Sequence, residues 1–75
     1  MTYPHPIIRQ IKATVQEVLP ATGLAYAVDD DNRTWGITRS TRGVGLASLQ
    51  HGQRVELTVT GHPEFELVSG YAPLN

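Results

Sequence analysis

The sequence lacks cysteine and has no long run of apolar residues. Without cysteine, neither a disulfide nor a thiolate metal site is available to stabilise the chain, which agrees with a reducing compartment. No apolar run approaches the roughly 20 residues that a membrane-spanning helix needs, and the first six residues have no charged-then-apolar signal pattern. These absences predict a cytoplasmic protein without a membrane segment.

Metal-binding and catalytic patterns are also missing. The three histidines are spread along the chain without the His-x-x-x-His spacing of a metal site. The run from Asp29 to Asn32 lacks the alternating acids and the central glycine of a calcium loop. Ser40 and Thr41 have no nearby histidine that could activate a nucleophile. We therefore expect a protein that is not an enzyme and that binds no metal or cofactor.

Acidic residues are absent from the middle of the chain. The net charge of the 75 residues is −1, so no overall field attracts the chain to nucleic acid or to an anionic membrane. Between Asn32 and Val55, however, there is no aspartate or glutamate, and this segment contains Arg33, Arg39, Arg42 and Arg54. One segment of a nearly neutral protein is therefore basic.

Alternation of apolar and polar residues predicts strands. The pattern is clearest over 54–60, and it is typical of a strand with one buried face. Residues 7–19 are rich in β-branched side chains and predict a long first strand with a bulge or bend at 17–19, although a helix also fits their spacing. Further strands are predicted over 24–28, 33–39 and 65–71.

Turn-forming residues separate these strands. Proline, glycine, aspartate and asparagine predict turns at 20–23, 29–32 and 61–64. The longest connection runs over 40–49 and ends in a short helical turn at 44–49. Two prolines make residues 1–6 an irregular arm, and residues 72–75 form a C-terminal tail.

Five short strands in 75 residues predict one small all-β domain that covers 1–75. Closing such a sheet into a barrel removes its unpaired edges. A meander of three strands, a long connection and a separate hairpin predict a five-stranded OB-fold barrel, with an SH3-like barrel as the alternative.

Two segments resemble the bacterial cold-shock domain. Residues from Gly23 to Asp30 resemble its glycine- and aromatic-rich strand with an acidic turn, and residues from Ser48 to Val55 resemble its Ser-Leu-x-x-Gly-Gln-Lys/Arg-Val motif before the fourth strand. The resemblance covers residues 11 to 71. It implies an OB-fold that binds single-stranded RNA or DNA by stacking bases on aromatics of the first three strands, over a positive groove.

The chain departs from this family at the base-stacking positions. Glu17 and Leu24 stand where the family has tryptophan and phenylalanine, and Gly36 and Thr38 replace a phenylalanine and a histidine. Only Tyr26 keeps an aromatic in register. Because each stacked base contributes about 1–3 kcal/mol, losing three or four stacks predicts weak binding.

Two functions follow as hypotheses. In the first, the chain is a weak, low-specificity module for single-stranded RNA or DNA, which the acid-free segment favours. In the second, it is a protein-interaction module on an OB barrel that has lost nucleic-acid binding, which the net charge and the missing aromatics favour. Pairing with a second copy through an edge strand is compatible with both. The predicted nucleic-acid-binding residues are Tyr26, Trp35, Arg33, Arg39, Arg42 and Lys12.

Each of these residues also has a structural interpretation. Tyr26 is expected either to stack a base or to be a half-buried aromatic of the barrel. Trp35 is expected either to be a stacking platform or partner contact, or to cap the core. The arginines either neutralise phosphates or are solvated charges on a loop and a strand face.

Overall fold

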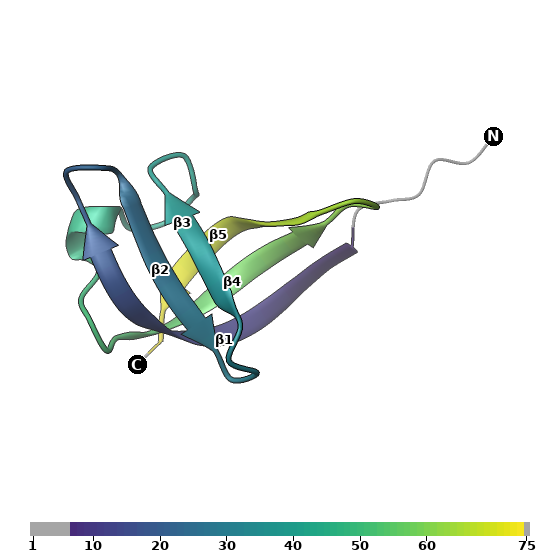
Figure 1. Cartoon of the computed structure of the whole chain (residues 1–75), viewed down its shortest axis with the longest axis horizontal. Helices are drawn as coiled ribbons and strands as arrows, with labels where there is room; N and C mark the ends of the chain where they lie inside the picture. The colour runs from purple at the N-terminus through teal and green to yellow at the C-terminus, as the bar shows by residue number, and fades with distance from the viewer. Residues whose placement is uncertain (1–6, 75) are drawn as a thin grey trace.

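The chain folds as five antiparallel strands in one curled sheet (Figure 1). The computed structural model describes residues 7–74, so the arm predicted at 1–6 lies outside the described residues. The elements are β1 (Ile7–Leu19), β2 (Leu24–Asp29), β3 (Thr34–Thr38), the 3₁₀ helix η1 (Leu46–Ser48), β4 (Arg54–Gly61) and β5 (Glu66–Pro73). Within residues 7–74, no helix has the length and apolar character needed to cross a membrane. The all-β prediction is confirmed.

The sheet order is β3-β2-β1-β4-β5, which is a meander of three strands joined to a hairpin through β1. β1 pairs with β4 along its first part and with β2 along its last part, so it belongs to both halves of the sheet. The β1–β2 register shifts between Val15 and Glu17, just before the bend predicted at 17–19. This bulge turns β1 from one half to the other, and the result fits the predicted OB-like barrel.

The expected boundaries of β2, β3, β4 and β5 differ from the structure by one or two residues. β3 begins at Thr34 rather than at residue 33, because the Arg33 N–H donates a hydrogen bond to the Asp29 carboxylate within the preceding turn. β5 continues to Pro73, so the tail predicted from residue 72 begins later. Pro73 is opposite Val55 at the end of an edge strand, where a missing N–H removes no ladder hydrogen bond.

The core lies on the concave face of the curled sheet. Side chains of β2, β3 and β4 alternate between buried and exposed positions, because successive strand residues point to opposite faces. η1 covers one end of the barrel (Figure 1) and adds Leu46 to the core, with Leu49 directly after it. The other buried hydrophobic residues are Ala13, Val15, Ala25, Ala27, Trp35, Ile37, Val55, Leu57, Val59, Val68 and Tyr71.

The barrel remains open between β3 and β5. Within the described residues, no backbone ladder joins these two outer strands of the sheet. The loop after β3 contacts β5 instead, through a bridge between Arg42 and Gly70 in which the Tyr71 N–H donates to the Arg42 carbonyl at 2.8 Å. Further along, the start of β1, the end of β4 and the start of β5 extend beyond the barrel (Figure 1). We call this extension, residues 7–10 and 60–67, the wing.

Candidate binding groove

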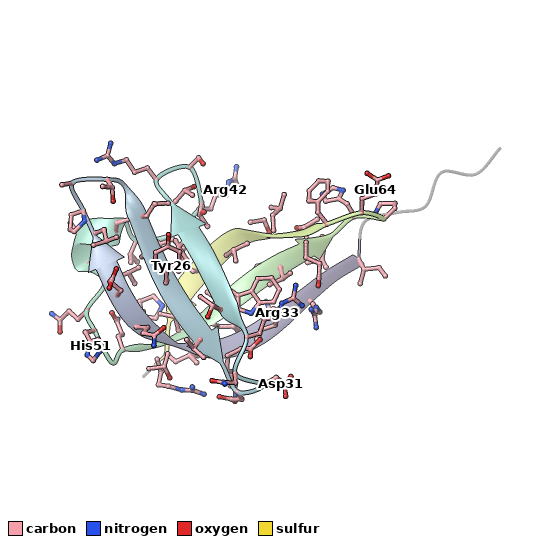
Figure 2. The ribbon with its side chains drawn as sticks, viewed as in Figure 1. Tyr26, Asp31, Arg33, Arg42, His51 and Glu64 are labelled. Carbon is pink, nitrogen blue, oxygen red and sulfur yellow. The ribbon has the colours of Figure 1, made fainter. Side chains whose placement is uncertain are left out.

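A groove of about 800 Å³ follows the open seam between β3 and β5. Arg33 precedes the start of β3 and Arg42 follows its end, so these arginines mark the two ends of the groove (Figure 2). Glu66 is the one acidic residue in the lining. Five hydroxyl side chains also line the groove: Thr34, Thr38, Ser40, Thr41 and Ser69.

The position of β3 at the edge of the sheet explains this lining. Thr34, Gly36 and Thr38 alternate with the buried residues of β3 and are exposed. After β3 the chain turns tightly, because the Thr38 N–H donates to Thr41 Oγ1 at 3.1 Å and the Thr41 N–H donates to the Thr38 carbonyl at 3.1 Å. This turn places Arg42 beside β5. The groove is therefore polar along one strand edge.

Trp35 lies in the core, with 5% of its surface exposed. Its indole N–H donates to Asp29 Oδ2 at 2.8 Å, and Asp29 Oδ1 accepts hydrogen bonds from the N–H groups of Asp31 and Arg33, each at 2.9 Å. The hydrogen bond from Trp35, followed by that from the Arg33 N–H, lowers the pKa of Asp29. Of the two roles expected for Trp35, the structure places it in the core and leaves only a small part of it at the groove. Sequence analysis identified Asp29 only as part of a turn.

A cluster of three charged residues crosses the seam above Trp35. Arg9 Nη2 donates to Glu66 Oε2 at 2.7 Å, and Arg33 Nη1 donates to Glu66 Oε1 at 3.0 Å. The hydrogen bond from Arg9 is the main cause of the lowered pKa of Glu66. The Arg33 guanidinium lies 4.3 Å from the centre of the Trp35 ring, a cation–π distance. The sequence contained one sign of Arg9 that was missed. Arg9 is two residues before Ile11 in β1, so it lies on the same face of the strand as the apolar residues that follow.

The other predicted residues lie away from the groove. Arg39 donates to the Pro20 carbonyl at 3.0 Å, and Lys12 lies opposite Glu56 in the β1–β4 pair. Tyr26 is half-buried on the outer face of β2 (Figure 2), opposite Gly36 of β3. The groove therefore brings together Arg33, Arg42 and the small exposed part of Trp35, but not Arg39, Lys12 or Tyr26.

The remaining charged residues give no sign of a metal centre. Arg54 pairs with Asp30 at 3.2 Å on the far side of the β2–β3 turn. Among residues 7–74, no three histidine, cysteine, aspartate or glutamate side chains gather as metal ligands. The groove itself presents two arginines and five hydroxyl side chains along the open seam.

Comparison of the chain with protein-family models, with curated proteins and with solved structures found no match. The resemblance to the cold-shock domain therefore depends on the sequence motifs alone, and the roles predicted for Arg33 and Arg42 depend on the geometry of the groove.

Proposed function

We propose that the chain is a weak, low-specificity binding module for single-stranded RNA or DNA. The nucleic acid lies along the groove beside β3. The observation that supports this function is the position of Arg33 and Arg42 at the two ends of one groove, with hydroxyl donors between them. β3 has five residues and is therefore about 17 Å long at roughly 3.4 Å per residue. An extended strand of a few nucleotides reaches both arginines.

The same geometry explains why the binding is weak. Base stacking supplies much of the affinity of OB-fold proteins for single strands, but Trp35 is buried and Tyr26 lies outside the groove lining. Backbone contacts then dominate, and they carry no base preference. For single strands, each neutralised phosphate contributes about −0.7 to the slope of log K against log salt, so two arginines predict a slope of about −1.4.

The test is a titration of 12-nucleotide DNA and RNA strands labelled with a fluorophore, followed by anisotropy at several salt concentrations. Anisotropy is preferable to tryptophan quenching because Trp35 is buried. We expect Arg42→Ala to weaken binding and to reduce the slope to about −0.7. Arg54→Ala is the matched control, because Arg54 pairs with Asp30 outside the groove. Anisotropy that stays constant up to high micromolar protein would exclude the proposed function.

A second candidate function is binding to another protein, and the wing is the observation that favours it. Ile7, Ile8, Phe65 and Leu67 are large apolar side chains exposed on the wing. Ile8 and Leu67 both pair with Thr60 and so share one face of the sheet, and exposed apolar groups that gather on one face mark interaction surfaces. β5 is also an edge strand, to which an extended segment of a partner can add. Concentration-dependent sedimentation that Ile8→Lys abolishes, together with no binding of oligonucleotides, is the result expected from this function.

A further inference from the structure

We propose that Arg9 and Arg33 form a phosphate-binding site at the wing end of the groove. Glu66 occupies this site in the free protein, and a phosphate of the nucleic-acid backbone displaces it on binding. This inference rests on the proposed nucleic-acid function. It adds Arg9 to the binding surface and makes Glu66 an internal competitor of the ligand.

The geometry of the cluster is that of an occupied anion site. Two guanidinium groups from different parts of the fold converge on one carboxylate, with N–O distances of 2.7 Å for Arg9 and 3.0 Å for Arg33. Guanidinium groups bind carboxylate and phosphate oxygens with the same planar arrangement of donors. Two positive charges face one negative charge, so the cluster keeps an excess of positive charge that a further or stronger anion neutralises.

The cluster is also accessible to a ligand. Glu66 and Arg33 line both the seam groove and a second hollow along the wing, which Arg9 lines as well. The side chains of Arg9 and Arg33 are 48% and 53% exposed, and that of Glu66 is 27% exposed. An incoming phosphate therefore reaches both guanidinium groups from solvent, without unfolding of the surrounding strands.

Displacement of Glu66 leaves the arginines in place. Ion pairs that are this exposed are screened by water and salt and contribute little to stability, so the carboxylate is replaceable. The Trp35 ring lies beneath Arg33, at 4.3 Å from its guanidinium carbon, and supports it independently of Glu66. Arg9 is held by the pairing of β1 with β4, where it lies opposite Val59.

The experiment compares Glu66→Gln with Glu64→Gln. Both variants remove one negative charge from the β4–β5 hairpin, but Glu64 lies near its tip (Figure 2) and forms no ion pair among residues 7–74. We expect Glu66→Gln to bind the labelled 12-nucleotide strand more tightly at low salt than Glu64→Gln does. The gain should be about 1.5- to 5-fold, because removing the carboxylate removes its competition with the phosphate. The salt slope should stay the same, because the bound phosphates contact the same arginines in both variants.

The outcomes distinguish a failure of the Arg9–Arg33 site from a failure of the proposed nucleic-acid function. If the wild type binds and the two glutamine variants bind with equal affinity, the Arg9–Arg33 site is wrong while the proposed function stands. If neither the wild type nor Glu66→Gln binds, both are wrong. Thermal melting checks that the variants are folded. Adding Arg9→Gln to Glu66→Gln should return the affinity toward that of Glu64→Gln, and an unchanged affinity would overturn the role of Arg9.

Discussion

Gly36 is the position at which a single substitution is expected to strengthen nucleic-acid binding most. It lines the groove and is exposed in the middle of β3. A Cβ atom added there meets no atom within 4 Å, so a side chain can leave the backbone there without a clash at its first atom. Gly36 pairs directly with Tyr26 of β2, and residues paired in this way have Cβ atoms about 5 Å apart. The substitution Gly36→Phe therefore places a second aromatic ring beside Tyr26.

The expected gain follows from the energy of base stacking. One stacked base contributes about 1–3 kcal/mol, and each 1.4 kcal/mol is about tenfold in affinity, so Gly36→Phe should tighten binding about 5- to 150-fold. The salt slope should stay the same, because the ring adds no charge. Stability should not fall, because glycine is unfavourable within strands and phenylalanine is favourable, on a scale of about 1 kcal/mol.

The assay is anisotropy of the labelled 12-nucleotide strand at one fixed low salt concentration, with Gly36→Leu as the matched control. Leucine fills the same open space but has no aromatic face for a base. If the leucine and phenylalanine variants bind equally, or if neither binds more tightly than the wild type, then bases do not pass over this part of β3. The proposed path of the strand along the groove would then be refuted.

Two further predictions concern stability. Leu57 is fully buried in the core, so Leu57→Ala should lower the free energy of unfolding by about 2–5 kcal/mol, measured by urea denaturation; a loss below 1 kcal/mol would contradict the assigned core. Asp29 and Glu66 have pKa values lowered from 3.8 and 4.5, so both bind protons more weakly in the folded state than in the unfolded state. Their stabilising effect is fully present above these ordinary values and is lost as the pH falls through the lowered values. Melting temperatures recorded from pH 7 to pH 2 should therefore fall in the acid range. The fall should be less steep for Asp29→Asn, which should also melt at a lower temperature than the wild type at pH 7. An equally steep fall of melting temperature with pH in both proteins would contradict this.

Local patterns in the sequence determined the strands, the turns and the all-β class. Alternation over 54–60 depends only on neighbouring residues that face opposite sides of one strand, and it predicted β4 to within one residue. The turn at 29–32 was predictable because aspartate and asparagine bond to their own backbone and tolerate left-handed conformations, as Asn32 does with its φ of 65°. The long first strand and its bend were predictable for similar reasons.

The tertiary structure alone decided where the candidate site lies. Arg9 and Glu66 are 57 residues apart, and their contact depends on the registers of β1 with β4 and of β4 with β5, which no local pattern specifies. The burial of Trp35 was predictable only in part. Trp35 and Ile37 are two residues apart in one strand and therefore point to the same, inner face, but the hydrogen bond from Trp35 to Asp29 depends on the geometry of the turn. Whether β3 and β5 meet and close the barrel also depends on the twist and bending of all the strands between them. Side-chain alternation is a local property of the chain, whereas a groove forms only where distant strands fail to meet.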